Sequence, residues 1–320
     1  MRMAGMMWSK IASDTFNEDV EISTLEASQL RMHMDQLSAA AELEELYHLL
    51  ISDYIEFEAT CLTTAVEYSA GRFRTMANYD EMRRRFNSCL MHLLTLTRAY
   101  LDCAPKLMMR VTRSEEVRRQ IKELMSQEYD SRLGYRVMEA LRNSAQHHGL
   151  PLHSFQSGLV WIPSGDKRKG RVHTYSMPTV QVDALTRDSD FKKKILEELR
   201  SFGESFDIRP MVRQYIEGIS KIQFVLRLEA DQHIHAARSA VATSIERWKA
   251  VRSQLGDDVD GAPLYIVDVD VDGQLCNEVP LNLRPCEIFD ELRVRNPQLA
   301  NLSISFVSNS VDEFGSMKSD

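Results

Sequence analysis

Apolar side chains recur at three- and four-residue intervals over long stretches of this 320-residue chain. That period places them on one side of an α-helix, whereas a half-buried strand would alternate at every second residue. Glycine and proline, which interrupt helices, number only 13 and 9. The clearest stripe comprises Leu43, Leu46, Tyr47, Leu50, Tyr54 and Phe57. The pattern therefore predicts a mainly α-helical fold with long amphipathic helices.

The same reasoning predicts six helices along the chain. They cover residues 36–69, 79–103, 113–127, 129–148, 189–202 and 208–253. Gly71 is expected to close the first helix, and Pro105 to end the second, because proline lacks a backbone N–H. Long helices joined by short turns favour antiparallel packing, so we expect an antiparallel helical bundle.

Two regions are predicted to contain strands. The stretches 159–162, Leu-Val-Trp-Ile, and 171–175, Arg-Val-His-Thr-Tyr, flank the turn signal at 163–166, which indicates a β-hairpin near 156–182 with a basic tip. Further on, residues 264–271 and 302–307 are expected to form strands around a short helix at 286–293.

These elements predict three parts of the chain. Residues 1–35 form an N-terminal arm, and residues 36–255 form the helical domain that carries the hairpin. Residues 256–320 form a small α+β appendage, whose last ten residues are expected to be disordered. From Gly256 onward there are 13 acidic and 4 basic side chains. Since the total charge is −8, the rest of the chain is close to neutral, which permits RNA binding without predicting it.

Composition excludes several classes of protein. No run of 18 apolar residues exists, so we predict no membrane span. Residues 1–10 contain no 7-residue apolar stretch, so we expect no secretory signal, and the five cysteines include no C-x-x-C pair. Buried thiols in a reducing, cytoplasmic compartment are therefore expected. Because the chain has no P-loop, no G-x-G-x-x-G and no G-x-S-x-G motif, we predict no nucleotide cofactor and no serine hydrolase. We also predict no metal, because His233 and His235 diverge on their helix and the acidic stretch at 268–272 lacks the glutamate of a calcium loop, with Val279 in its place.

The most informative segment is residues 142–147, Arg-Asn-Ser-Ala-Gln-His. On a helical wheel, Met138 and Leu141 face the core, whereas Arg142, Asn143, Gln146 and His147 spread over the opposite side. Gly149 and Pro151 follow, so the helix should end at about residue 148. An arginine suits phosphate, and a histidine in the last turn suits proton transfer.

This pattern has a structural alternative. An arginine followed after four to six residues by a histidine also occurs at Arg85 and His92, and at Arg227 and His233. The segment at 142–147 can therefore equally be a polar helix face with a histidine at the C-terminal end, where the helix dipole favours cations.

The stretch ALRNSAQHHGLP, residues 140–151, resembles the signature helix of the HEPN superfamily, in which an arginine and a polar residue precede a histidine. The stretch FNSCLMHLLTLTRAYLD, residues 86–102, is similar to the long helix that packs beside it. The resemblance covers residues 80–151, with helix 36–69 added loosely. It implies a HEPN-like bundle that forms homodimers about a two-fold axis.

The resemblance also implies a metal-independent endoribonuclease that acts on single-stranded RNA, as a toxin or antiviral effector. Arg142, Asn143 and His147 would then be the catalytic residues. His147 would transfer protons while the 2′-hydroxyl attacks its phosphate, and Arg142 would stabilise the charge. Some family toxins carry a tyrosine two residues after the histidine; here that residue is Gly149.

Substrate binding is predicted for Gln146, which lies on the same helix face, and for the hairpin tip, Lys167, Arg168 and Lys169. A protein partner, such as an antitoxin or a defence component, would fit this class. The rival prediction is a non-catalytic helical dimer that serves as an interaction or ligand-sensing module. A third is that the acidic appendage covers the RNA site.

Overall fold

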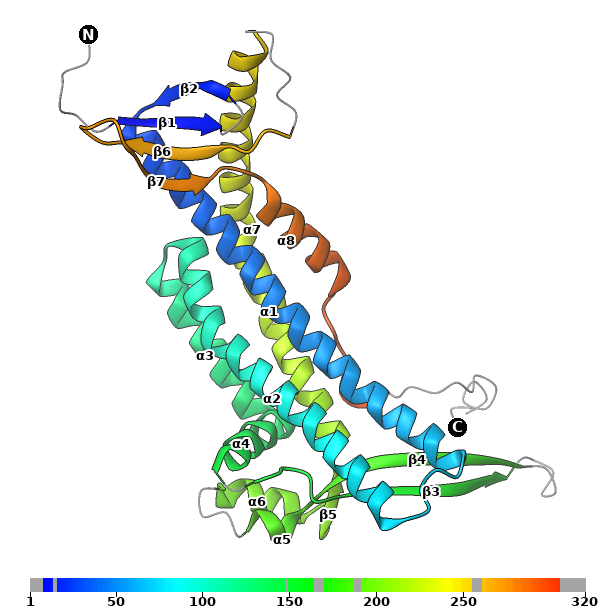
Figure 1. Ribbon diagram of the computed structural model, residues 1–320. Coiled ribbons are helices and arrows are strands. Elements are labelled where there is room, and N and C mark those ends of the chain that lie inside the picture. The colour runs from blue at the N-terminus through cyan, green and yellow to red at the C-terminus, as the bar shows by residue number, and fades with distance from the viewer. Residues whose placement is uncertain are drawn as a thin grey trace, which may run out of the picture. The chain divides into compact units, whose positions relative to one another are not determined.

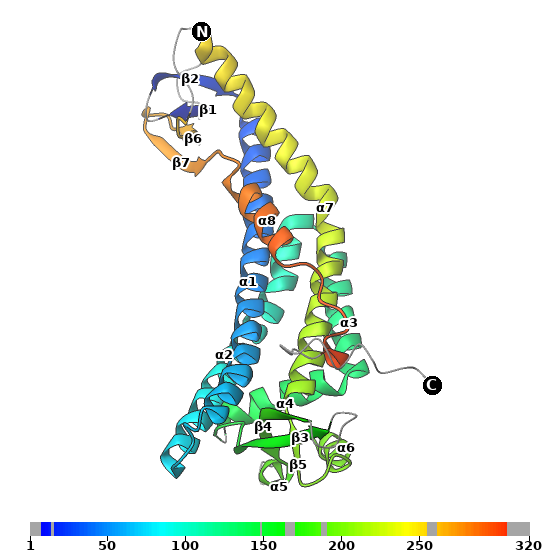
Figure 2. The same ribbon diagram turned by 90° about the vertical axis from the view of Figure 1, so that its right-hand side faces the viewer.

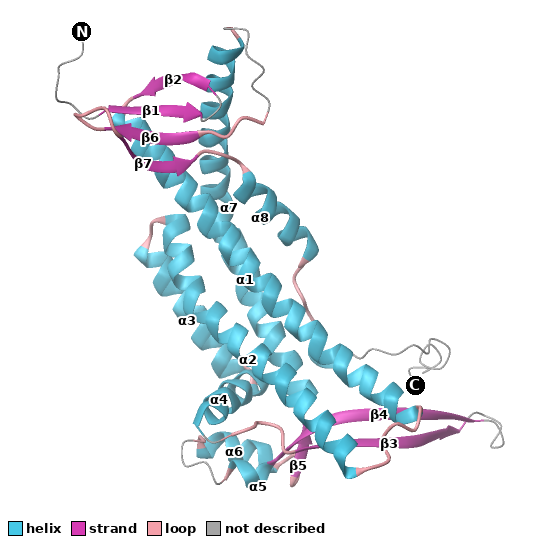
Figure 3. Cartoon of the chain, viewed as in Figure 1, coloured by secondary structure: helices cyan, strands magenta, loops and turns pink. Residues whose placement is uncertain are grey.

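The computed structural model describes residues 8–13, 16–147, 149–163, 170–186, 191–254 and 261–305. The chain is mainly helical with small antiparallel sheets (Figures 1 and 3). The helices are α1 (Thr24–Ser69), α2 (Met76–Thr112), α3 (Glu115–Ser131), α4 (Leu133–His147), α5 (Val182–Leu185), α6 (Lys193–Arg200), α7 (Arg209–Ser253) and α8 (Arg284–Arg295). Over this described part, no helix combines the length and apolarity needed to cross a bilayer.

The strands are β1 (Trp8–Ser13), β2 (Phe16–Ile22), β3 (Ser154–Pro163), β4 (Gly170–Gln181), β5 (Ser205–Asp207), β6 (Tyr265–Val269) and β7 (Leu275–Pro280). The chain divides into two compact units. Unit 1 comprises residues 1–49, 98–123 and 224–297, and unit 2 comprises 50–97, 124–223 and 298–320. Helices α1, α2, α3 and α7 contribute residues to both units, so the units do not follow the predicted boundaries at 35 and 255.

Unit 1 contains a four-stranded antiparallel sheet in the order β2-β1-β6-β7, whose strands lie side by side in Figure 1. Strand β6 pairs with β1 from Tyr265 opposite Ala12 to Val269 opposite Trp8. A strand of the predicted C-terminal appendage therefore shares a sheet with a strand of the predicted N-terminal arm. The buried residues of β6 need partners for their main-chain groups, and β1 and β7 supply them.

Helix α8 packs on α7 and α1, and Figure 2 shows it beside α1. Arg238 of α7 contacts Asp290 at 2.8 Å, and Arg293 pairs with Asp231 of α7. The Asn296 amide also lies 3.2 Å from Nδ1 of His48 on α1. The predicted helix at 286–293 is confirmed, but residues 302–304, predicted as strand, form a 3₁₀ turn.

Unit 2 contains the predicted hairpin. Strands β3 and β4 pair without a register shift from Ser154 opposite Thr179 to Pro163 opposite Gly170. The short strand β5 adds to β4 at three residues only, 179–181. The helical core of unit 2 is formed by apolar residues of α1, α2, α4 and α7, including Phe57, Phe86, Leu90, Leu93, Leu94, Val137, Leu141, Ile216 and Ile219.

The largest differences between the predicted helix boundaries and the structure are at α1 and α2. Helix α1 begins at Thr24 rather than 36, because Ser23 Oγ accepts a hydrogen bond from the Glu26 N–H and caps the helix. Helix α2 continues through Pro105 to Thr112, since buried Ala104, Leu107 and Met108 hold both sides of the proline in the core. The long helix predicted at 208–253 is confirmed as α7.

Candidate functional site

The candidate site lies at the C-terminal end of α4, and contacts at the other end fix this helix. The Gly134 N–H donates to Gln214 Oε1 of α7 at 2.9 Å. A Cβ at position 134 would lie 2.6 Å from the Met211 carbonyl oxygen, so only glycine permits this approach. One residue later, the Tyr135 ring meets the Tyr215 ring edge-on at 4.8 Å.

Further along α4, ion pairs and hydrogen bonds tie it to two neighbours. Arg136 Nη2 contacts Glu198 of α6 at 2.6 Å, and the Tyr215 hydroxyl donates to Glu139. Between these polar contacts, Met138 and Leu141 are completely buried, as the helical wheel predicts. The first three turns of α4 are therefore held on both sides within unit 2.

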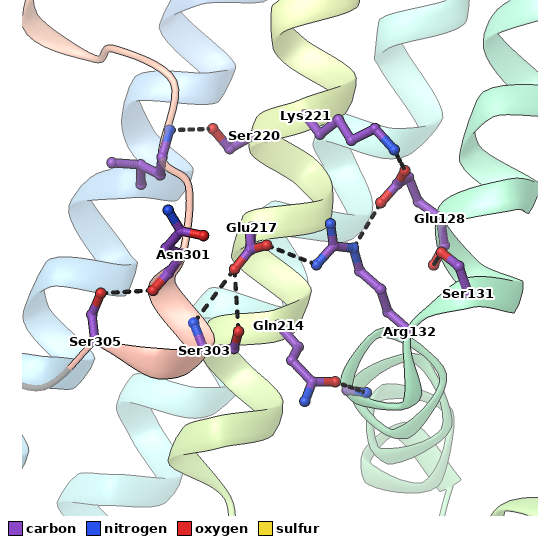
Figure 4. Close-up of polar contacts among 12 residues, drawn as sticks. Glu128, Ser131, Arg132, Gln214, Glu217, Ser220, Lys221, Asn301, Ser303 and Ser305 are labelled. Carbon is purple, nitrogen blue, oxygen red and sulfur yellow. Dashed lines mark hydrogen bonds and ion pairs between the residues drawn. The ribbon is translucent and has the colours of Figure 1, made fainter. Parts of the chain in front are cut away.

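A charged cluster stands just before α4 and comprises Glu128, Arg132, Glu217 and Lys221, the Glu128 cluster (Figure 4). Arg132 donates from Nε to Glu128 at 2.7 Å and from Nη1 to Glu217 at 3.0 Å, and Lys221 donates to Glu128. Burial raises the pKa of Glu128, but the bonds from Lys221 and Arg132 outweigh burial and hold the pKa below its usual value.

The Glu128 cluster also holds the segment that follows α8. Ser303 donates from its N–H and its hydroxyl to Glu217 at 3.4 Å, and the Leu299 N–H donates to Ser220 Oγ at 2.7 Å (Figure 4). Sequence reasoning missed this cluster. Its signal is the four-residue spacing of Glu128 to Arg132 and of Glu217 to Lys221, which places opposite charges on one helix face.

The predicted catalytic residues occupy the last turns of α4. Asn143 and His147 are exposed and Arg142 is half-buried. Arg142 Nη1 donates to Asn143 Oδ1 at 2.8 Å, and no carboxylate among the described residues forms an ion pair with this guanidinium. Gln146 is exposed beside them. Arginine, amide and imidazole are thus presented on one stretch of helix surface.

The chain leaves α4 through an anchored turn. Helix α4 ends at His147, Gly149 adopts a φ of 122°, and Pro151 is buried. Asn87 of α2 then holds Leu152 by two hydrogen bonds of 2.9 Å, one to its N–H and one to its carbonyl oxygen. The predicted helix end is confirmed, and Asn87 fixes the path of the chain beyond it.

The other predicted site residues are not placed. Lys167, Arg168 and Lys169 lie outside the described residues, as does His148.

No family model, no curated protein and no solved structure matches this chain. Chemically, the end of α4 offers a permanent cation and a titratable imidazole, which together can bind a phosphate and move a proton.

Proposed function

We propose that the chain is a metal-independent endoribonuclease of HEPN type, with a HEPN-like helical bundle and its active site at the end of α4. The observation that carries the proposal is the exposure of His147 beside Arg142, whose described side-chain partner is a neutral amide. A guanidinium without a carboxylate partner keeps its charge available to an incoming phosphate.

In this proposal His147 takes the proton from a ribose 2′-hydroxyl as that oxygen attacks the adjacent phosphorus. The P–O5′ bond breaks, and the leaving 5′ oxygen receives a proton, so the products are a 2′,3′-cyclic phosphate and a 5′-hydroxyl. Arg142 stabilises the negative charge on the phosphate during attack. Asn143 and Gln146 bind the RNA strand, and a homodimer doubles the site. An enzyme of this kind would serve as a cytoplasmic toxin or antiviral effector under the control of a protein partner.

The test is incubation of the purified chain with single-stranded RNA in EDTA, with end-group analysis of any fragments. Proton transfer by a positioned side chain contributes about 10²–10⁴-fold in rate. We therefore expect at least about 100-fold slower cleavage by His147→Ala and by Arg142→Ala. His235→Ala, which removes an exposed histidine of α7, is the matched control. Inert wild-type protein, or equal rates in all four forms, contradicts the proposal.

A second candidate is a non-catalytic interaction module that uses the same face of α4. The observation that favours it is the Arg142–Asn143 hydrogen bond, because it joins two neighbours on one polar helix face, as a purely structural helix end would. In that case Arg142→Ala weakens the binding of a partner or of a second copy, measured by light scattering, and no form cleaves RNA.

A further inference from the structure

The outer half of the β3–β4 hairpin exposes an unusual amount of apolar surface. Leu159, Val160, Trp161 and Ile162 are consecutive, and their exposed fractions are 60%, 48%, 55% and 36%. Consecutive strand residues point to opposite faces, so this part of the ribbon is open on both sides. Val172 of β4, opposite Trp161, is 54% exposed as well. Soluble proteins rarely leave such a surface uncovered.

The free edge of β3 lacks most of the features that normally prevent edge pairing, and its one proline, Pro163, is the last residue. Among the described strands β3 pairs with β4 alone, so its other edge offers unpaired main-chain N–H and C=O groups. Natural edge strands are usually short, bulged or charged. Strand β3 has ten residues, a register without a bulge and no charged side chain.

Charge distinguishes the possible occupants of this edge. A nucleic acid needs cations on the contacting strand, but β3 has none, whereas the neighbouring β4 carries Arg171 and His173. A second copy of β3 brings no charge to this edge, and its exposed apolar residues would lie against apolar residues. We infer that β3 pairs antiparallel with β3 of a second copy of this chain, about a two-fold axis at Val160.

The residue pairs across such an axis are self-complementary. Val160 faces Val160 of the second copy, Leu159 faces Trp161, and Ile162 faces Gly158. At Gly158 a Cβ would lie 2.7 Å from the Tyr175 hydroxyl oxygen, so the Tyr175 ring already covers the glycine. Ile162 of the second copy would therefore meet an aromatic side chain rather than a gap.

The paired stretch extends from residue 158 to 162 in each copy, short of Pro163, which has no N–H to donate, and continues the sheet as β4-β3-β3-β4. An interface of this size falls below the roughly 1,200 Å² of standard complexes, so we expect a dimer with a dissociation constant in the micromolar range. The pairing uses no residue of α4 and is independent of the proposed nuclease activity.

The first experiment measures the mass of the full chain by light scattering and analytical ultracentrifugation over about 1–200 µM, which brackets the expected dissociation constant. Wild-type protein should pass from monomer to dimer. Val160→Lys places two ammonium groups face to face at the axis and should weaken association at least about 100-fold. His173→Lys adds the same charge directly opposite Val160 on β4, away from the free edge, and should leave the dimer intact.

The second experiment tests the axis. Directly opposite residues of paired strands have Cα atoms about 4.5–5.5 Å apart, within the range that a disulfide spans. Val160→Cys should therefore form a covalent dimer on mild oxidation, whereas Leu159→Cys, which faces Trp161, should not. Far-ultraviolet circular dichroism confirms that each variant folds. A monomeric wild type, a Val160→Lys variant that still dimerises, or a Val160→Cys variant that fails to cross-link would overturn the inference.

Discussion

At the scale of single residues, the most consequential contact of unit 1 is a buried ion pair. Arg227 of α7 donates two hydrogen bonds, of 2.8 and 2.6 Å, to the carboxylate of Glu44 on α1. The side chains are 6% and 1% exposed. The third nitrogen of Arg227 donates to the Asn296 carbonyl oxygen at 2.9 Å, and the guanidinium lies 5.4 Å from the centre of the Tyr47 ring. Each of the three guanidinium nitrogens therefore donates a hydrogen bond within unit 1.

Removal of one partner would leave the other charge buried without compensation, which costs about 3–5 kcal/mol. We expect Glu44→Leu and Arg227→Met each to lower the unfolding free energy of unit 1 by that amount. The double variant Glu44→Leu/Arg227→Met should lie close to wild type, because two apolar side chains of similar volume need no charge partner. Urea denaturation of all four proteins gives the double-mutant cycle. Additive losses would show that the pair acts as two independent residues.

At the scale of elements, the position of α4 depends on its close approach to α7 at Gly134. A second glycine, Gly218 of α7, lies on the same contact, where an added Cβ would sit 3.1 Å from the Tyr135 ring and 3.2 Å from Arg132 Cδ. These neighbours are side chains and can shift. At Gly134 the obstacle is the Met211 carbonyl oxygen, which is backbone and cannot move without moving α7.

Gly134→Ala should therefore destabilise unit 2 by about 1–3 kcal/mol, the range found for overpacked sites. Gly218→Ala should be close to neutral, since the gain of up to about 1 kcal/mol in helix propensity offsets a small side-chain adjustment. Thermal unfolding followed by circular dichroism compares the two variants. Equal midpoints would mean that the close approach of α4 to α7 does not constrain the fold.

The elements also show how far the sequence predicts this structure. The ends of α7 and α4 follow from local information, namely the apolar stripe and Gly149 with Pro151. The Ser23–Glu26 capping pair indicates the start of α1, but it lies outside the apolar stripe from which the helix at 36–69 is predicted. Pro105 predicts a helix end because helix propensity depends on the local sequence. The core packing that keeps α2 helical through Pro105 involves residues far away in the chain.

Long-range pairing accounts for most of what sequence reasoning could not supply. Strand β1 is short and mixed in polarity, and its partner β6 begins more than 250 residues later, as the Ser9–Asp268 hydrogen bond shows. No short-range feature of the sequence indicates that β1 and β6 pair. The candidate site was predictable only in part: the wheel gives the exposure of Asn143 and His147, but not the bond between Arg142 and Asn143.

At the scale of the whole molecule, each unit contains a buried carboxylate that must be ionised. In unit 2 this is Glu128. In unit 1 it is Asp268, which accepts hydrogen bonds from Ser9 at 2.6 Å and Asn277 at 3.0 Å and pairs with Arg31. Burial raises the pKa of Asp268, but these three partners outweigh burial and lower the pKa below its usual value. Both units are therefore stabilised by a carboxylate that holds its charge more strongly when folded.

A lowered folded pKa fixes the sign of the pH dependence. The stabilisation is complete above the unfolded pKa values, about 4.3 for glutamate and 3.9 for aspartate, and is lost as the pH falls through and below them towards the folded values. Glu128→Gln should weaken unit 2 by about 2 kcal/mol at pH 7, because hydrogen bonds to a charged group are lost. The variant should also lose less stability than wild type between about pH 5 and pH 3. Asp268→Asn should do the same for unit 1.

Thermal midpoints between about pH 3 and pH 8 measure both effects, since this range brackets the unfolded pKa values. Glu123→Gln is the control, because its side chain is 64% exposed and its contact with Arg119 is 3.9 Å long, so its curve should match that of wild type. If Glu128→Gln kept the wild-type slope in acid, the ionised cluster would contribute nothing to folding. The contacts of Arg132 would then organise the start of α4 without stabilising it.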